Sequence, residues 1–453
     1  MAAALRASSR SLCLRGSAQP FTMRVLQVAA RMASLAGFAL PLMERLRGQG
    51  YEVEALGDFD GFESRLRDAG FPIHSWRCGH IFNPLAIWRA RRELAVFLSE
   101  HHYDVVHTHV SFAGIIANPV AFPRTPCLLY TQHGFYVHEG LSPLARRAWL
   151  AIEKIGLRWA HHVICVSQAE KQLAETLGVG PPSKFHLIPG VGADLQRFQF
   201  TPQERQRKRA AIRRSLGIGP DDTVILTVSR LTWDKGYREL IEAARAVASP
   251  PTPSPSRRGD RQPGVPLTLP GTATVPVAGV ERGEPSLTAK QRQHHAAAAA
   301  TETAALPGYV NFLAAGSGKD ERAIRASINR AGLSDRFILL GWRDDVPDLY
   351  CAADLFVFAS HREGLPVAPI EAMASGLPVI ASDLPGCREE IEHEQSGLLY
   401  RVGDAGALTD AIRRLLAAPD LAAHLAAAGR TRAAAFSLDA ALSRQLELYA
   451  EFA

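Results

Sequence analysis

The segment that most constrains the fold lies near the carboxyl end of the chain, where a strand, a helix and a second strand follow one another. Residues 355–359 and residues 378–381 are apolar runs of the kind that form buried strands. A polar turn and a helix of small apolar residues separate them. Two strands joined by a helix run parallel in one sheet. The segment therefore predicts an α/β fold with a parallel sheet.

Two carboxylates mark the turn and the helix of this unit. Glu363 lies in the turn, and Glu371 lies eight positions later on the helix, whose first turn holds Pro366. A helix that begins at the carboxyl end of a parallel strand directs free N–H groups at an anion, and Gly364 lets a ligand approach the backbone closely. Carboxylates are poor phosphate ligands, but they accept hydrogen bonds from sugar hydroxyls. We therefore expect a phosphate with sugars on both sides.

Histidines follow two predicted strands in the first half of the chain. Residues 104–109 end in His109, and the strand that starts at Cys127 leads into His133-Gly134. Both histidines would lie at the carboxyl edge of a parallel sheet, where ligands bind. A histidine in such a place can equally be a structural residue satisfied by its neighbours. Both therefore remain candidates for the site.

Two cations follow a buried strand in the second half of the chain. Residues 223–229 run directly into Arg230, and Lys235 follows five positions later at the start of a helix. Two cations so placed can hold a diphosphate from two sides through charge-assisted hydrogen bonds. The alternative is a surface ion pair of Lys235 with Asp234 or Glu239.

The length of 453 residues is too great for one core and predicts two domains with extra segments. Residues 1–22 have the composition of a transit peptide, but the chain more simply starts at Met23, with a disordered extension or a mis-assigned start before it. Residues 249–307 are rich in Pro, Ser, Gly and Ala and predict a disordered insertion whose removal leaves activity intact. The expected parts are residues 1–22, 23–200, 201–436 with the insertion, and a final helix at 437–453 that packs back on the first domain.

The net charge of +6 is modest, and the basic residues occur in small clusters rather than in one stripe typical of nucleic-acid binding. The clusters lie at residues 89–92, 146–147 and 205–214. They predict solvated helix faces or, alternatively, attraction to an anionic membrane surface. No apolar run reaches the ~20 residues of a membrane-spanning helix. Six widely spaced cysteines without a C-x-x-C pair indicate neither a metal site nor a disulfide framework, which fits a cytoplasmic protein.

The Glu-x7-Glu spacing of Glu363 and Glu371, followed by AMASGLPVIASDLPG and SGLLY, resembles the donor-binding signature of retaining glycosyltransferases of family 4. That family has the GT-B fold, two Rossmann-like domains that face each other across a cleft. The resemblance extends over residues 23–452 apart from the insertion and is strongest from residue 341 to residue 404.

The resemblance also implies roles for single residues. Glu371 would hold the ribose of a nucleotide-sugar, Glu363 and His133 would orient the transferred sugar, and Arg230 and Lys235 would bind the diphosphate. Further donor-binding residues implied by the resemblance are Gly316, Arg343 and the segment Gly364, Leu365, Pro366 and Val367. On the acceptor side it implies Gly37 and His109.

The sequence departs from the family in the loop after the first strand. Many members carry a Gly-Gly pair there, whereas residues 32–37 of this chain offer Gly37 alone. A second departure concerns Asp58-Phe59-Asp60, which matches the D-x-D metal motif of a different glycosyltransferase fold. Because it follows the second strand of a Rossmann-like domain, we expect a solvated loop there and not a metal site.

The function implied by the resemblance is transfer of a sugar from a nucleotide-diphospho-sugar to a hydroxyl of a lipid-linked or envelope glycan, with retention of configuration. No metal and no further cofactor are expected, because the leaving diphosphate accepts the proton and the protein stabilises its charge. The expected partners are the nucleotide-sugar, the glycan acceptor and an anionic membrane surface, and not nucleic acid. The alternatives are an epimerase or phosphorylase on the same fold, and a scaffold that binds a sugar-nucleotide without turnover.

Overall fold

The computed structural model describes residues 22–79, 82–137, 141–190, 192–247 and 309–452. The expectations for residues 1–21 and for the insertion at 249–307 lie outside the described residues.

The first sheet has seven strands in the order β3-β2-β1-β4-β5-β6-β7. The interior strand β1 pairs in parallel with β2 on one side and with β4 on the other. The strands are β1 Arg24–Arg31, β2 Glu52–Asp58, β3 Ile73–Ser75, β4 Val105–His109, β5 Cys127–Gln132, β6 His162–Cys165 and β7 Phe185–Leu187.

The second sheet has six strands in the order β10-β9-β8-β11-β12-β13. Its central strand β8 pairs in parallel with β9 and with β11, so the turns that follow β8 and β11 leave the same edge of the sheet. The strands are β8 Thr223–Val228, β9 Val310–Ala315, β10 Phe337–Gly341, β11 Leu355–Phe358, β12 Val379–Ser382 and β13 Leu398–Tyr400. Two parallel α/β sheets confirm the predicted fold class.

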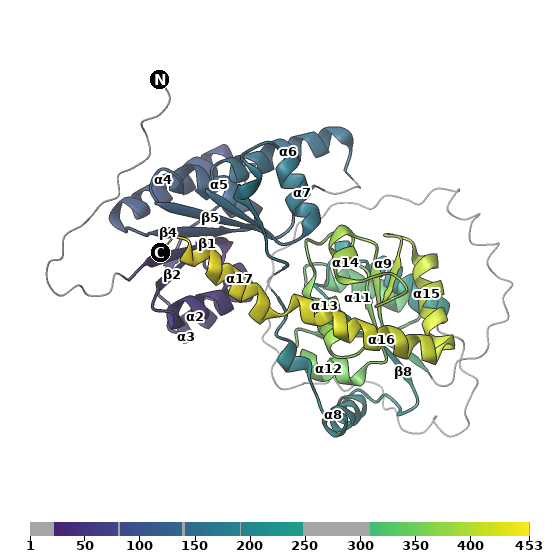
Figure 1. Cartoon of the computed structure of the whole chain (residues 1–453). Helices are drawn as coiled ribbons and strands as arrows, with labels where there is room; N and C mark the ends of the chain where they lie inside the picture. Colours follow the sequence, from purple (N-terminus) through teal and green to yellow (C-terminus); the bar gives the residue numbers. More distant parts are fainter. Residues whose placement is uncertain (1–21, 80–81, 138–140, 191, 248–308, 453) are drawn as a thin grey trace. The chain divides into compact units, whose positions relative to one another are not determined.

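Helices connect successive strands in both sheets, as crossover connections of parallel strands require. Figure 1 labels most of them. In the first half of the chain they are α1 Met32–Ser34, α2 Leu40–Gly48, α3 Glu63–Asp68, α4 Pro84–Glu100, α5 Ser111–Ala121, α6 Pro143–Arg158 and α7 Gln168–Thr176. In the second half they are α8 Pro202–Ser215, α9 Tyr237–Val247, α11 Glu321–Arg330, α12 Val346–Ala352, α13 Val367–Ala374, α14 Pro385–Glu390, α15 Ala405–Ala417, α16 Pro419–Ala433 and α17 Leu438–Ala450.

The described chain forms two compact units. The first comprises residues 22–130, 155–162 and 448–452, and the second comprises residues 131–154 and 163–447. The second unit has a core on each face of its sheet. Along β8, Val224 and Leu226 enter one core and Ile225 enters the other. Because successive side chains of a strand point to opposite faces, an unbroken apolar run fills both cores.

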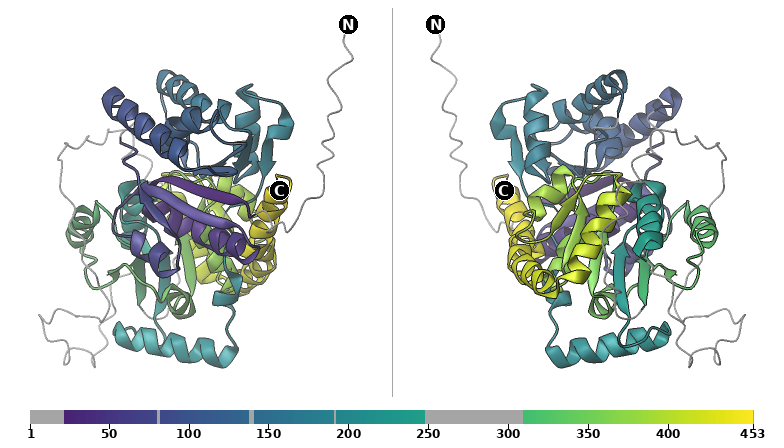
Figure 2. Two further views of the ribbon diagram at one scale, coloured as in Figure 1. Left: turned by 90° about the vertical axis from the view of Figure 1, so that its left-hand side faces the viewer. Right: turned by 90° about the vertical axis from the view of Figure 1, so that its right-hand side faces the viewer.

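Helix α8, the teal helix at the bottom of both views in Figure 2, carries the densest basic cluster. The side chain of Arg213 is 4% exposed and donates to a carboxylate oxygen of Asp354 at 2.6 Å and to the carbonyl of Asp222 at 2.7 Å. Arg209 donates to the other oxygen of Asp354 at 2.5 Å. Asp354 also accepts the backbone N–H of Val224 at 2.8 Å. The prediction that this cluster is a solvated face or a membrane surface is therefore wrong for Arg209 and Arg213.

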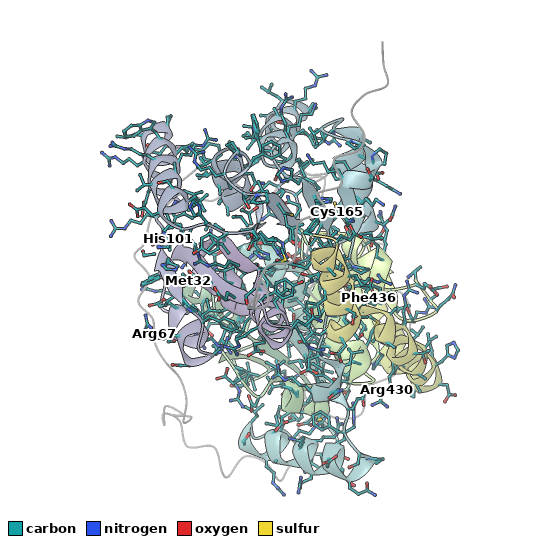
Figure 3. The ribbon with its side chains drawn as sticks, turned by 60° about the vertical axis from the view of Figure 1, so that its left-hand side comes forward. Met32, Arg67, His101, Cys165, Arg430 and Phe436 are labelled. Atoms are coloured by element: carbon teal, nitrogen blue, oxygen red, sulfur yellow. The ribbon has the colours of Figure 1, made fainter. Side chains whose placement is uncertain are left out.

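The segment after β1 is helical and not the loop that the sequence analysis predicted. Residues 32–34 form α1, and a π-helical turn, Leu35–Ala39, joins it to α2. Met32, labelled in Figure 3, is completely buried. Leu35 and Ala39 are buried as well. Their spacing of three and four residues buries one face of a helix. That apolar spacing outweighs the backbone freedom of Gly37.

The Asp58-Phe59-Asp60 segment is held by local contacts. The side chain of Asp60 is 7% exposed and pairs with Arg31 at 2.9 Å. It also accepts the backbone N–H of Ala33 at 3.1 Å, within the first turn after β1. The expectation of a solvated loop is therefore wrong for Asp60, whose carboxylate ties the ends of β1 and β2 together.

The contacts of Asp354 generate a stability prediction. Replacing Asp354 by Asn should destabilise the second unit by about 2 to 3 kcal/mol, because the buried guanidinium of Arg213 loses its counter-charge. The control is Lys208→Ala, which breaks the more exposed pair with Asp348 and should cost at most about 1 kcal/mol. Urea unfolding measures both, and equal shifts in the two variants would contradict the structural role of Asp354.

Candidate functional site

Lys235 lies in the turn that follows β8, at the end of a 3₁₀ turn, Trp233–Lys235. Its side chain is only 8% exposed, and its Nζ lies 2.6 Å from a carboxylate oxygen of Glu363. The hydroxyl of Ser360 lies 3.4 Å from the same Nζ. Because β8 and β11 are parallel neighbours, these two turns meet at one edge of the sheet. The structure thus brings together Lys235 and Glu363, which the sequence analysis assigned to one site.

Arg230 reaches the same place from the exposed side. Its side chain is 64% exposed, and its guanidinium lies 3.6 Å from the carboxylate of Asp234, from which Nζ of Lys235 lies 4.0 Å. Burial alone would raise the pKa of Asp234, but the charges of Lys235 and Arg230 help to hold that pKa below its usual value. The ion pair of Lys235 with Asp234 that we considered as an alternative therefore exists, but the pair with Glu363 is much shorter.

Helix α13 begins directly after the turn that carries Glu363. Pro366 occupies the N-cap position, no side chain caps the helix, and Val367 and Ala368 are its first two residues. Pro369 follows in the first turn, where a proline does not disturb the helix. The first amides of an α-helix have no partner within the helix. The start of α13 therefore offers N–H groups to an anion.

Glu371 lies on the second turn of α13 and is largely enclosed. Burial raises the pKa of Glu371 to about 7, although the hydroxyl of Tyr350 donates to its Oε2 at 3.1 Å and the charge of Arg197 acts in the opposite direction. The same hydroxyl lies 3.1 Å from the carbonyl of Ala368. The sequence analysis missed Tyr350. The only available signal is that a buried tyrosine hydroxyl usually needs a partner.

The loop after β5 packs against the loop after β11. A β-carbon placed on Gly134 would lie 3.4 Å from the backbone nitrogen of Gly364, so the two backbones touch. The guanidinium of Arg362 lies over the ring of Tyr136, 4.7 Å from its centre. Burial lowers the pKa of His133 to about 4, so its imidazole is neutral at physiological pH. A neutral imidazole can both donate and accept a hydrogen bond.

Glu170 is a second residue that the sequence analysis missed. Its side chain is buried at the start of α7, where Oε2 accepts the backbone N–H of Val166 at 3.3 Å. Oε1 has no hydrogen-bond partner among the described residues and faces Gly364. Burial, with contributions from the charges of Glu389 and Glu153, raises the pKa of Glu170 to about 8.

Two predicted donor-binding residues have structural contacts of their own. A β-carbon on Gly316 would lie 2.0 Å from the carbonyl oxygen of Ser229, so a glycine is needed there for the loop after β9 to pack on the end of β8. Arg343 donates from Nε to Asp345 at 2.6 Å. In the described part of the chain, Arg343 forms no hydrogen bond or ion pair with Lys235 or Glu363, and its role near the base stays a prediction.

The two predicted acceptor-side residues lie in the first unit. Gly37 is exposed in the π-helical turn. His109 is buried, and its Nε2 lies 2.7 Å from the amide oxygen of Gln27. The amide nitrogen of Gln27 donates to the hydroxyl of Tyr449 at 2.9 Å, and this hydroxyl lies 2.8 Å from Nδ1 of His107. His109 thus belongs to a buried hydrogen-bond network, and an acceptor role for it stays a prediction.

Comparison with known families gives two successive matches. Residues 36–190 match the model of the glycosyl transferase 4-like domain, and residues 286–418 match the model of the glycosyl transferases group 1. Together the two matches cover more than half of the 453 residues.

Relatives with assigned activities align over most of the chain. An N,N'-diacetylbacillosaminyl-diphospho-undecaprenol α-1,3-N-acetylgalactosaminyltransferase from Campylobacter jejuni is 24% identical over 94% of this chain and 98% of its own length. A UDP-Gal:α-D-GlcNAc-diphosphoundecaprenol α-1,3-galactosyltransferase from Escherichia coli is 24% identical over 70% of this chain and 67% of its own length.

Solved structures share the fold. Anabaena Alr3699/HepE, in complex with UDP-glucose, superimposes with a TM-score of 0.66 at 20% identity, over 95% of this chain and all of HepE. WaaG, a glycosyltransferase of lipopolysaccharide biosynthesis, gives a TM-score of 0.64 at 15% identity, over 94% of this chain and 99% of WaaG. Residues 36–190 thus match a glycosyl transferase 4-like domain and residues 286–418 a glycosyl transferases group 1 domain, and the chain is a glycosyltransferase with the GT-B fold.

Proposed function

We propose that the protein transfers a sugar from a nucleotide-diphospho-sugar to a hydroxyl group of a lipid-linked or envelope glycan, with retention of configuration and without a metal ion. The observation that carries this proposal is the meeting of Lys235, Glu363 and the uncapped start of α13 at one edge of the second sheet. A diphosphate needs the cation and the amides, and a sugar beside it needs the carboxylate.

The chemistry that these groups support is departure of a negatively charged diphosphate. As the glycosidic bond breaks, negative charge grows on the leaving phosphate, and Lys235, Arg230 and the first amides of α13 stabilise it. The acceptor hydroxyl attacks from the same face of the sugar and gives its proton to the departing phosphate. The neutral imidazole of His133 and the carboxylate of Glu363 orient the sugar, and no side chain acts as a nucleophile.

Relatives support the choice of substrates. Both aligned transferases are named for acceptors linked to diphospho-undecaprenol, and HepE is bound to UDP-glucose. We therefore take a UDP-sugar and a polyprenyl-linked glycan as the first substrates to test. Release of nucleoside diphosphate together with a new glycoside supports transfer. An isomerised sugar-nucleotide would support the epimerase alternative, and binding without any product would support the scaffold alternative.

Lys235 provides the direct test of the diphosphate site. Lys235→Ala should lower turnover by about 10²- to 10³-fold, the effect of removing one preorganised group that stabilises developing charge. Arg238→Ala is the matched control, because Arg238 lies three residues later, in the first turn of α9, and its guanidinium stacks on the ring of Trp233. Assays of nucleotide release measure both variants. Wild-type turnover in Lys235→Ala would refute the assignment.

Glu371 gives the donor affinity a pH dependence. Its pKa is raised to about 7, so the carboxylate is protonated below that pH and ionised above it. Because sugar hydroxyls donate to the ionised form, KM for the nucleotide-sugar should rise as pH falls from 7.5 to 5.5 by about tenfold, as expected for titration of one group. Glu371→Gln should show a higher KM with no such slope. An unchanged slope in this variant would exclude Glu371 as its origin.

Helix α4 is the best candidate for contact with a membrane. Leu85, Trp88, Arg92 and Val96 recur every three or four residues along one exposed face, and Trp88 is 56% exposed. Apolar side chains mixed with arginines on one face favour the surface of an anionic bilayer. Among the described residues, no helix has the length and apolarity to cross a bilayer. We therefore propose peripheral contact through α4.

Flotation with vesicles tests this contact. The wild-type chain should float with vesicles that contain phosphatidylglycerol, and Leu85→Ser/Trp88→Ser should recover several-fold less protein, because the apolar side chains no longer enter the interface. Phe38→Ser removes an exposed aromatic residue outside α4, in the π-helical turn after β1, and serves as the control. Equal recovery with neutral and anionic vesicles would contradict the proposal.

A further inference from the structure

The backbone of the donor loop, residues 363–366, is packed on two sides without room for a side chain at Gly364. A β-carbon on Gly364 would lie 2.9 Å from Oε1 of Glu170 and 3.1 Å from the Cα of Gly134. On its other side, a β-carbon on Gly386 would lie 2.0 Å from the carbonyl oxygen of Gly364. The donor loop therefore packs between two other segments, with Gly134 and Glu170 on one side and Gly386 on the other.

One side chain directly connects the segments on the two sides of the donor loop. Glu389 lies on α14, three residues after Gly386, and its two carboxylate oxygens accept the backbone N–H groups of Gln168 at 2.9 Å and Ala169 at 3.0 Å. These two amides belong to the first residues of α7, the helix that carries Glu170. The contact therefore runs from the helix of Gly386 to the helix of Glu170.

The start of α7 suits a carboxylate. The free amides of a helix N-terminus and the helix dipole both favour a negative charge there. The hydroxyl of Ser167 accepts the backbone N–H of Glu170, which leaves the two preceding amides to Glu389. With a pKa of about 8, Glu170 is mainly the neutral acid at pH 7. Glu389 thus supplies the negative charge that binds this helix start.

We propose that Glu389 is a positioning residue for the proposed transfer reaction, because its carboxylate ties α14 to α7 and thereby clamps the donor loop against His133-Gly134. This inference rests on the proposed function. Among the described residues, Glu389 forms no hydrogen bond or ion pair with Lys235 or Glu371, the proposed ligands of the diphosphate and the ribose. Loss of the clamp should therefore disturb the alignment of the sugar more than the binding of the nucleotide.

Hydrogen exchange of the free chain tests the clamp without any substrate. In Glu389→Ala, the amides of residues 133–137, 168–169 and 363–368 should exchange about tenfold faster than in the wild type, the scale of a lost helix cap. Glu389→Gln keeps an oxygen acceptor and should lie between the two. The control is Glu392→Gln, which removes a glutamate three residues away that pairs with Arg432. Wild-type exchange of the donor loop in folded Glu389→Ala would overturn the inference.

Kinetics test the consequence for the reaction. With UDP-glucose or whichever UDP-sugar the wild type turns over, Glu389→Ala should lower kcat about tenfold and change the dissociation constant of UDP less than about threefold. Glu389→Gln should recover part of kcat. A UDP affinity that falls as much as kcat, or an unchanged kcat, would overturn the positioning role. A wild-type chain that binds UDP but transfers no sugar would refute the proposed function instead, and the exchange data would still decide the clamp.

Discussion

The contact between the ammonium group of Lys235 and the carboxylate of Glu363 fixes the geometry on which the rest of the site depends. A buried lysine must have a compensating charge, and a misplaced partner would leave an ion in a medium that solvates it poorly. The 2.6 Å pair therefore holds the turn after β8 against the turn after β11. Arg230, Asp234 and the start of α13 then lie around a site that is formed before any ligand arrives, which is the condition for electrostatic stabilisation of a leaving group.

The other titratable groups around the site differ in whether they carry a charge near pH 7. His133 is neutral because its surroundings disfavour the imidazolium ion, and Glu170 is mainly neutral for the corresponding reason. Glu371 titrates near pH 7 and Glu389 binds a helix start as a carboxylate. The cations that a diphosphate would need are Arg230 and Lys235, which pair with Asp234 and Glu363 in the unliganded chain. Glu170 and Glu389 contact the backbone around the donor loop and make no ion pair with either cation among the described residues.

The sequence predicted those parts of the site that depend on local spacing. Lys235 and Glu363 follow apolar runs whose order in a parallel sheet brings their turns to one edge. Contacts between segments far apart in the sequence could not be predicted in this way. Gln168 and Glu389 are 221 positions apart, and no local pattern around either residue predicts their hydrogen bond. The resemblance to a family with a glycine-rich loop predicts a loop after β1, whereas the apolar spacing of Met32, Leu35 and Ala39 forms a helix there. Burial of Arg213 and Asp60 likewise depends on partners far away in sequence or on the neighbouring strand.

The most direct measurement is a crystal structure of the chain with a bound UDP-sugar. Our account predicts that the diphosphate contacts Nζ of Lys235, the guanidinium of Arg230 and the first amides of α13, with the ribose at Glu371 and the sugar at Glu363. Binding of the diphosphate away from Lys235 and α13, with the pair of Lys235 and Glu363 untouched, would contradict it.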